Sequence, residues 1–354
     1  MDKQQKQQLL DAMEKAICEK SFYEFFVRAF EIAEPSVPIS VNFHHKYLCD
    51  ILQAEAERIK ENKPKDKDII INIPFRSTKS LLVTVLFPAW CWAVYPKMRF
   101  ITASYSADIS IEHATKSRDI VQSEWYQKHW GETFHIKKDQ NLKARYENNF
   151  LGSRRATSVG GSVTGQGGDI ILVDDPTSPK NAASQVEREN ANEWYKSTLY
   201  SRLNNPTTGV RIIIMQRVHE DDLSGYLLYN SPDKHTHICI PAELSDDLKP
   251  KELAKHYEDG LFWKERFNTE ILDDYKSALG SYGYAGQLQQ RPTPANSGMI
   301  KKTWFKIENE KLNGVVNFII DPAYTASEKN DPSALLAYVF EENKWQITEV
   351  QNVR

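Results

Sequence analysis

The chain has 354 residues, of which 40% are hydrophobic and 26% charged, so it is able to bury a core and is not disordered. At roughly 150 residues per domain, this length predicts two domains and part of a third. The net charge of -3 excludes a general electrostatic attraction to nucleic acid, so any contact with DNA needs a local basic patch. The four cysteines are widely spaced without a C-x-x-C pair, which argues against a zinc site or a disulfide framework and suits a reducing cytoplasm.

No segment has the pattern of a membrane span or a signal peptide. The longest apolar run, LLVTVLFPAWCWAVYP, is interrupted by Pro88 and is too short to cross a bilayer. The first twenty residues are polar and amphipathic, without an apolar core of signal-peptide length. We therefore expect no membrane partner.

Two kinds of hydrophobic pattern follow one another along the chain. Helical spacing of apolar residues predicts helices over residues 4–30 and 44–61. From Asp68 onward the pattern changes to short runs rich in Ile and Val: IIINI, RFITASY, DIILVDD, RIIIMQ and ICIPAEL. Such runs indicate buried parallel strands of an α/β sheet. Residues 245–290 are charged and helical in pattern.

RPTPANSG, Arg291 to Gly298, is the clearest linker, because proline and glycine break regular structure. After it, VVNFIID, ALLAYVF and KWQITEV predict three successive strands of a new sheet. The chain stops at Arg354 early in that second sheet, so we expect a fragment. We divide the sequence into an N-terminal helical region, a core, a helical lid with linker, and the first strands of a second domain: residues 1–65, 66–240, 241–298 and 299–354.

The segment INIPFRSTKS ends in Lys79 and Ser80, where a phosphate-binding loop places its lysine and its magnesium-binding hydroxyl. The G-x-x-x-x-G-K-[ST] pattern has glycines where this chain has Ile73 and Thr78. By itself the segment fits an ordinary strand-to-helix turn equally well.

A second strand ends in carboxylates, which ATP hydrolysis also requires: one on magnesium at the end of a neighbouring strand and one to polarise the attacking water. The run DIILVDD brings Asp174 and Asp175 to the carboxyl end of a strand. We expect Ser80 and Asp174 to hold Mg²⁺, the aspartate through water, and Asp175 to be the catalytic base. A helix cap or a solvated turn is the alternative for two such aspartates. The joint occurrence of both segments favours a nucleotide site.

These segments together resemble the large terminase subunit of tailed phages. PFRSTKS is similar to the family's phosphate loop, which usually has glycine where this chain has Thr78. GGSVTGQGGDIILVDDP resembles its Walker B region, and FITASYSAD the segment after the loop. IIIMQRVHEDDLSG is similar to its coupling strand, with Gln216 as the polar coupling residue and Val218 in place of a tryptophan. QLQQRPTP resembles its ATPase-to-nuclease linker, and the resemblance runs from about Phe43 to the C-terminus.

The resemblance implies an α/β, ASCE-type P-loop ATPase with a mostly parallel central sheet and a helical lid, followed by the start of an RNase H-like nuclease. It implies three catalytic residues: Asp175, Arg76 as an arginine finger in cis, and Gln216 as the sensor of the γ-phosphate. Arg217 binds a phosphate or pairs with Asp221 or Asp222. The implied ATP-binding residues are Pro74, Phe75, Arg76, Ser77, Thr78, Lys79, Ser80 and Arg217.

Further residues keep two readings each. Arg154 and Arg155 precede the carboxylate strand and serve as a trans-acting finger, contact DNA, or lie on a solvated turn. The segment His44-His45-Lys46 stands where the family has its adenine-side residues, but paired histidines also fit a surface or capping position.

Asp321 ends the strand VVNFIID, as the first metal ligand of RNase H-like nucleases does. Two Mg²⁺ or Mn²⁺ ions held by carboxylates would activate water there. An Asp-Pro turn is the alternative, and Asp331 is a weaker candidate. The resemblance implies that the remaining nuclease carboxylates lie beyond residue 354, so nuclease activity of this chain alone is not expected.

The leading hypothesis is an ATP-driven motor that moves double-stranded DNA into a viral procapsid. Its implied partners are DNA, the portal protein, the small terminase subunit and further copies in a ring on the portal, with a monomer in isolation, in the host cytoplasm. Lys137–Lys138 or Lys143–Arg145 would contact DNA. The alternatives are a metal-dependent nuclease and a portal-docking module whose nucleotide site does not hydrolyse. HEDDL and RPTP count against a helicase.

Overall fold

The computed structural model describes residues 2–163, 165–293, 306, 314–322, 333–341 and 344–353. The chain divides into two compact units, Met1–Gly298 and Met299–Arg354, which are described separately. The first unit is a mixed α/β structure built on an eight-stranded sheet, as the apolar runs predicted. The finer boundaries at residues 65 and 240 stay predictions.

The strand order of the large sheet is β3-β4-β5-β2-β6-β7-β1-β8. Six strands, from β5 to β8 in this order, are parallel, and the β3–β4 hairpin joins their edge in antiparallel fashion. The bounds are β1 Asp68–Asn72, β2 Arg99–Ser104, β3 Ile136–Leu142, β4 Arg145–Asn148, β5 Ser153–Ser158, β6 Ile170–Asp174, β7 Val210–Met215 and β8 His235–Cys239. The sequence did not predict β3, β4 and β5 as members of this sheet.

Strand β7 lies between the phosphate-loop strand β1 and the carboxylate strand β6. The expectation that β1 and β6 are neighbours is therefore wrong. The strand that precedes Gln216 is instead adjacent to both, because its buried Ile and Met side chains pack between them. All three carboxyl ends lie at one edge of the sheet, where open α/β sheets bind ligands.

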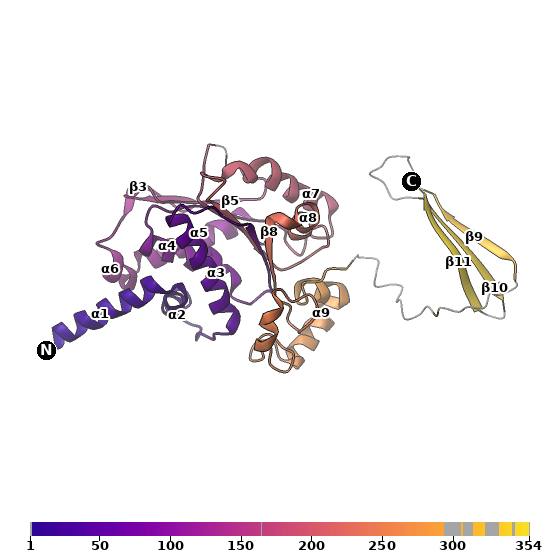
Figure 1. The fold of residues 1–354 in the computed structure, drawn as a ribbon, viewed down its shortest axis with the longest axis horizontal. Coiled ribbons are helices and arrows are strands. Elements are labelled where there is room, and N and C mark those ends of the chain that lie inside the picture. Colours follow the sequence, from indigo (N-terminus) through magenta and orange to yellow (C-terminus); the bar gives the residue numbers. More distant parts are fainter. Residues whose placement is uncertain are drawn as a thin grey trace. The chain divides into compact units, whose positions relative to one another are not determined.

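Successive side chains of a strand point to opposite faces, so the central strands bury two separate cores. Ile69 and Ile71 of β1 join a core with helices α2, α3 and α4, whereas Ile70 joins a second core with α7 and α8. Figure 1 shows these two groups of helices on opposite faces of the sheet. The bounds are α2 Phe22–Ala33, α3 Phe43–Lys60, α4 Phe87–Val94, α5 Ala107–Gln122, α6 Glu124–Trp130, α7 Gln185–Trp194 and α8 Leu223–Asn230.

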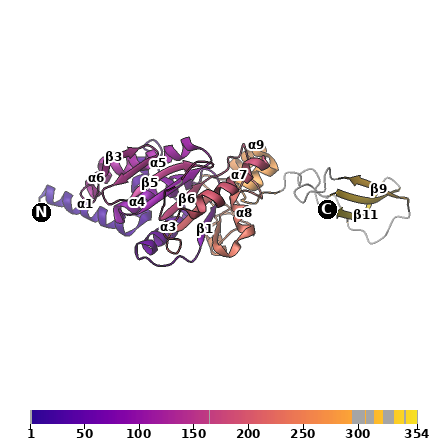
Figure 2. The same ribbon diagram turned by 90° about the horizontal axis from the view of Figure 1, so that it is seen from above.

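The predicted N-terminal helix is two helices, α1 (Lys3–Lys20) and α2. The break falls at Ser21, whose side chain accepts a hydrogen bond from the Glu24 amide and so caps α2. In Figures 1 and 2, α1 extends away from the rest of the unit, with the N-terminus at its far end. Its apolar residues Leu9 and Met13 are consequently exposed, although their spacing is helical.

The helix after the phosphate loop is irregular, because residues Leu81–Leu86 form a π-helical segment before α4. Other short helical segments are π-helical Tyr195–Leu199 and 3₁₀-helical Tyr200–Arg202, Pro232–Lys234 and Lys251–His256. Of the predicted helical region 245–290, only the later part is a regular α-helix, α9 (Thr269–Gln287), with a kink at Gly280. The part before α9 packs through buried Phe262 and Trp263.

The second unit contains the three predicted strands, β9 (Val316–Asp321), β10 (Ser333–Glu341) and β11 (Lys344–Val353), in the antiparallel order β11-β10-β9. Asp321 is exposed at the end of β9. Asp331 lies outside the described residues. The RNase H-like assignment therefore stays a prediction. Within the described part of the chain, no helix is both long and apolar enough to cross a membrane.

Candidate nucleotide-binding site

The loop between β1 and the following helix contains two residues in the left-handed region, Arg76 (φ 58°) and Thr78 (φ 65°). A β-branched side chain rarely adopts this backbone conformation, because its Cβ crowds the neighbouring carbonyl oxygen. Thr78 occupies the position where glycine is usual in such loops. The loop thus adopts a glycine-type conformation with a threonine.

Ser77, between these two residues, is held at two of its oxygen atoms. Its hydroxyl donates to the Pro74 carbonyl oxygen at 2.7 Å, and its own carbonyl oxygen is 3.0 Å from His44 Nε2. The next residue is tied as well, because the Leu82 amide donates to the Thr78 carbonyl oxygen at 3.0 Å. These bonds fix the loop at the start of the helix, where backbone N–H groups and the helix dipole favour an anion.

Asp174, the last residue of β6, is buried and meets the start of that helix. Its Oδ1 accepts from Ser80 Oγ at 3.1 Å, and its Oδ2 accepts from Thr84 Oγ1 at 2.9 Å. His113 Nδ1 on α5 lies 3.6 Å from the same Oδ2. The two predicted magnesium ligands, Ser80 and Asp174, are therefore in contact.

Sequence reasoning missed both Thr84 and His113. Thr84 stands four residues after Ser80 on the same helical face, and that spacing was a usable signal. Nothing in the sequence singles out His113, which comes to the site through the packing of α5 on the sheet.

Asp175 is the next residue and turns sharply out of β6, with φ 43°. Its Oδ2 is 2.9 Å from Lys79 Nζ, and its Oδ1 accepts from the Gln216 amide at 3.1 Å. Burial raises the pKa of the Asp175 carboxyl above its ordinary value, and the Lys79 ammonium opposes that shift. A carboxyl with a raised pKa is a better proton acceptor, as a general base requires.

Gln216 follows β7 directly and is buried beside Asp175, with 7% of its surface exposed. Its Oε1 is buried and has no hydrogen-bond partner among the described residues. A buried amide oxygen without a donor is costly, so it suits a site that takes a hydrogen from water. Gln216 thus lies where its predicted role places it, next to the carboxylate strand; the role itself stays a prediction.

Arg217 forms a buried ion pair with Asp222, with Nε 2.9 Å from Oδ1 and 3.0 Å from Oδ2. Its Nη2 donates to the His219 and Glu220 carbonyl oxygens, each at 3.3 Å. The structure therefore shows the ion-pair alternative for this residue. Its contact with a phosphate stays a prediction, as does the finger role of Arg76, whose side chain is exposed on the loop.

Arg154 is not on a solvated turn, so that expectation is wrong. It is buried in β5, and its Nη2 donates to the Thr84 carbonyl oxygen at 2.6 Å. The π-helical segment exposes this carbonyl, because its bonding pattern differs from that of a regular helix. Arg155, the next residue on the strand, is half-buried.

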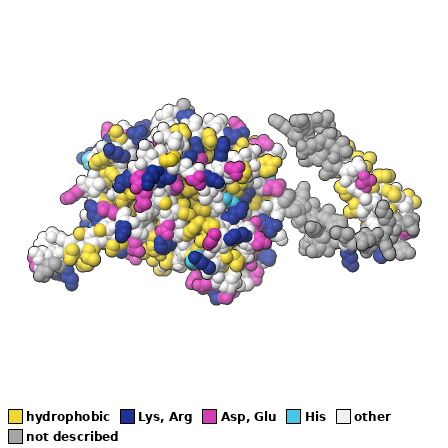
Figure 3. Space-filling model, in the orientation of Figure 1, with side chains coloured by type: hydrophobic (Ala, Val, Ile, Leu, Met, Phe, Trp, Pro, Cys, Tyr) yellow, Lys and Arg dark blue, Asp and Glu magenta, His cyan; other side chains and the backbone are white. Residues whose placement is uncertain are grey.

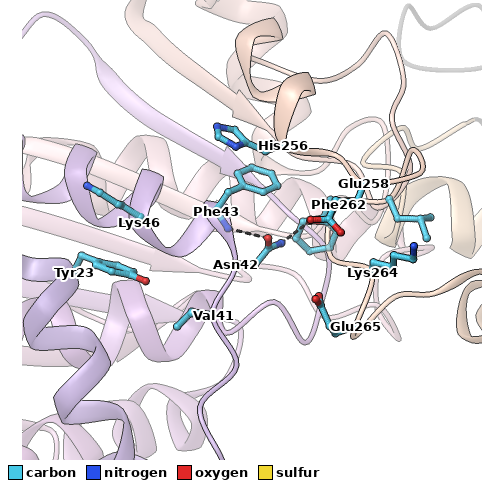
Figure 4. A pocket seen from close by; sticks show the side chains of 11 residues that line it. Tyr23, Val41, Asn42, Phe43, Lys46, His256, Glu258, Phe262, Lys264 and Glu265 are labelled. Atoms are coloured by element: carbon cyan, nitrogen blue, oxygen red, sulfur yellow. Dashed lines mark hydrogen bonds between the residues drawn. The ribbon is translucent and has the colours of Figure 1, made fainter.

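The histidine pair at the start of α3 is buried, not on the surface. His44 contacts the loop, and His45 Nδ1 accepts from the Asn42 amide at 2.9 Å in the cap of α3. Beside them, a cavity of about 410 Å³ lies between the start of α3 and the segment that carries His256 (Figure 4). Phe43 stacks on His256 there, with ring centroids 5.0 Å apart. Lys46 lines the cavity and pairs with Asp50.

The residues proposed to contact DNA lie on the β3–β4 hairpin. Lys137 and Arg145 share one acidic partner, Glu147, at 3.5 Å and 2.8 Å, whereas Lys138 and Lys143 are exposed. On the face of the first unit seen in Figure 3, basic and acidic side chains are interspersed. The DNA contact stays a prediction.

The donor set at the loop fits a magnesium nucleotide. Hydroxyl and carboxylate oxygens of Ser80 and Asp174 are ligands that Mg²⁺ prefers, with the remaining positions left to water and phosphate. Lys79 supplies the cation for the phosphates. Within the described residues, no group of three or more His, Cys, Asp or Glu side chains is arranged to hold a metal ion by itself. The metal role of Asp321 accordingly stays a prediction.

The fold is that of a parallel α/β sheet with a loop-and-carboxylate site at its carboxyl edge. Solved structures similar to this chain are large terminases of thermophilic phages. One such large terminase, from a thermophilic bacteriophage, is 12% and 10% identical in two crystal forms, with TM-scores of 0.38 and 0.40, over 85% of this chain and 67% of that chain. An arginine-to-alanine mutant of the Thermus phage P74-26 large terminase ATPase domain is 10% identical, with a TM-score of 0.46, over 75% of this chain and 98% of that chain. No family model and no curated protein matches the sequence. With TM-scores below 0.5, function has to be argued from the site itself.

Proposed function

We propose that the first unit is an ATPase and that it drives the packaging of double-stranded DNA in the manner of a large terminase subunit. The observation that carries the ATPase is the double contact across β7: Ser80 with Asp174, and Lys79 with Asp175. These four side chains are the parts that phosphoryl transfer needs, in two pairs at one sheet edge.

Each residue has a separate task in this proposal. Lys79 and the loop amides bind the phosphates, and Ser80 with Asp174 holds Mg²⁺, which when bound neutralises phosphate charge. Asp175 accepts a proton from the attacking water at its carboxylate. Gln216 orients that water through its side-chain amide and links it to β7, because the backbone amide of residue 216 already contacts Asp175.

The packaging role is supported by the sequence segments that surround this site. The loop, the VDDP and HEDDL segments and the QQRP linker occur in terminase order, and the second unit starts with the strand that carries Asp321. In this proposal the substrate is double-stranded DNA, the partners are the portal protein, the small subunit and further copies of the chain, and Asp321 binds Mg²⁺ or Mn²⁺ in a nuclease.

The direct test is steady-state ATP turnover of the purified chain, with and without linear double-stranded DNA. We expect Lys79→Ala and Asp175→Ala each to reduce turnover by about 100-fold or more. Lys255→Ala is the matched control, because Lys255 is exposed and far along the chain from the loop. Turnover that persists unchanged in both site variants would refute the ATPase.

Thr78 favours one second candidate, a portal-docking module that binds nucleotide without hydrolysis, since a strained loop presents its amides less readily to the transition state. Tight nucleotide binding with no turnover in the unaltered chain would support it. DNA cleavage that requires Asp321, in a chain without ATPase activity, would instead support the nuclease alternative.

A further inference from the structure

We propose that His44 is a positioning residue for the phosphate loop, which holds the Ser77 carbonyl oxygen and thereby keeps Thr78 in its left-handed conformation. The inference rests on the proposed function of the loop. It assigns to α3, which precedes the sheet in the chain, a part in setting the geometry of the nucleotide site.

The hydrogen bond from His44 acts on the peptide that matters. The Ser77 carbonyl oxygen and the Thr78 amide nitrogen belong to one planar peptide group, so fixing the oxygen fixes the plane about which Thr78 takes its φ of 65°. The Thr78 N–H leaves the opposite edge of that plane, and it is one of the amides that a phosphate would meet. The ring of His44 is therefore connected to the anion-binding groups through a single peptide.

Water does not substitute for this bond. His44 is fully buried, and Ser77 is 1% exposed. The His44 ring lies against Phe262 and Trp263, at centroid distances of 5.2 Å and 5.1 Å, and against His45 at 3.9 Å. This aromatic cluster fixes the ring, and the ring in turn fixes the loop.

The chemistry of the ring agrees with a donor role. Burial lowers the pKa of His44 to about 4, so the imidazole is neutral at pH 7. A carbonyl oxygen only accepts, so the hydrogen of the neutral ring is on Nε2. His44 Nδ1 is buried and has no partner among the described residues, which leaves the contact with Ser77 as the ring's hydrogen bond in this part of the chain.

A strained conformation persists only where the surroundings determine it. Glycine at residue 78 would adopt a φ of 65° without strain and would need no external support. The hydrogen bond from His44 thus compensates for the missing glycine. This reasoning predicts that the effects of His44 and Thr78 variants on nucleotide binding are not additive.

The test uses the full chain with two variants at residue 44, each in the Thr78 and the Thr78→Gly background. His44→Phe keeps an aromatic ring and removes the donor, whereas His44→Gln places an N–H near the position of Nε2. Binding of a fluorescent ATP analogue with Mg²⁺ is measured, and amide hydrogen exchange of residues 75–82 is followed without nucleotide. If His44→Phe unfolds the chain, His44→Met takes its place.

We expect His44→Phe to weaken binding about tenfold, because a buried carbonyl oxygen loses its donor. His44→Gln should retain affinity within about threefold, and Thr78→Gly should restore most of the loss in the Phe variant. Exchange of the loop amides should quicken in the Phe variant and not in the Gln variant.

Equal behaviour of the Phe and Gln variants in both measurements would overturn the proposal. So would an effect of Thr78→Gly on binding that is the same factor with His44 and with Phe at that position. If the unaltered chain does not bind nucleotide, the proposed ATPase fails, but hydrogen exchange still decides whether His44 holds the loop.

Discussion

Lys79 Nζ lies 2.9 Å from Asp175 Oδ2, so the loop lysine and the second carboxylate form an ion pair. The lysine is buried and the aspartate side chain is 22% exposed, so water weakens this pair only in part. For Lys79 to reach a phosphate it must exchange one anionic partner for another. Nucleotide binding therefore competes with the pair, and the exchange frees Asp175 to accept a proton.

Asp175→Asn separates these two effects. The amide no longer holds the Lys79 ammonium, so we expect nucleotide affinity to rise roughly fivefold, for a pair worth about 1 kcal/mol, while turnover falls about 100-fold. Calorimetric titration with a magnesium nucleotide, beside a turnover assay, measures both. Lys79→Ala is the control and should lose binding as well. Weaker binding by Asp175→Asn would show that the pair does not compete with the phosphates.

Thr78→Gly tests the strain in the loop. The left-handed conformation costs a residue with Cβ about 1–2 kcal/mol, and glycine removes this cost but adds entropy to the unfolded chain. We therefore expect nucleotide affinity to rise or to stay unchanged, with little change in the unfolding free energy. Thr78→Ala, which keeps Cβ without the branch, should fall between the two. A clear loss of affinity with glycine would mean that the loop is not built as described.

Thr84→Val removes the hydroxyl that donates to Asp174 Oδ2 at 2.9 Å and keeps the shape of the side chain. Groups that orient a metal ligand typically change metal affinity by about 10- to 100-fold when they are lost. We expect the Mg²⁺ concentration for half-maximal nucleotide binding to rise about tenfold. Thr84→Ser keeps the hydroxyl and is the matched variant. The hypothesis fails if Val and Ser give the same Mg²⁺ dependence.

Asp222→Ala tests the buried pair with Arg217. Asp222 is fully buried, accepts from Arg217 Nε and from the amides of Val218 and Gly225, and caps α8. Removing it leaves a buried guanidinium without its anion, so we expect a loss of about 3–5 kcal/mol in unfolding free energy by urea denaturation. Asp221→Ala is the control, because that side chain is 72% exposed, and it should change stability by less than about 0.5 kcal/mol.

The same measurement on Arg217→Met bears on the ATP-binding role predicted for this arginine. A residue that acts mainly in the ion pair lowers stability when it is replaced. A residue that acts mainly on a phosphate lowers nucleotide affinity while stability is retained. Stability and affinity measured together therefore distinguish the two readings.

His237 predicts an acid-sensitive stability. Burial lowers its pKa from 6.5 to about 3, and its Nε2 lies 2.9 Å from Asn72 Oδ1. Below pH 6.5 the unfolded chain binds a proton that the folded chain does not bind until about pH 3. Stability from this residue is therefore complete above the unfolded pKa and is lost as the pH falls, by about 1.4 kcal/mol per pH unit.

His237→Gln keeps an N–H donor toward Asn72 and does not titrate. Between about pH 7 and pH 5 we expect this variant to lose about 2 kcal/mol less unfolding free energy than the unaltered chain. Urea denaturation at the two pH values checks this. Identical pH dependence of the two proteins would contradict a buried neutral His237.

The sequence by itself was sufficient for the sheet and for the first ligands. Runs such as DIIIN and IILVD have no polar face, so they predict strands buried on both sides, and they are β1 and β6. Lys79, Ser80 and the aspartates at 174 and 175 were identified because each lies just after such a run or at its end. Local order along the chain carries this information, since a strand delivers the residue at its end to the edge of the sheet.

Tertiary structure decided which of these residues touch and what holds them. The position of β7 between β1 and β6 depends on packing among all the strands, and so does the approach of His113 from α5. The hydrogen bond between His44 and Ser77 spans 33 residues and exists only because aromatic packing fixes the ring beside the loop. Contacts of that kind leave no local pattern, because their partners are distant in the chain and are brought together by burial of the core.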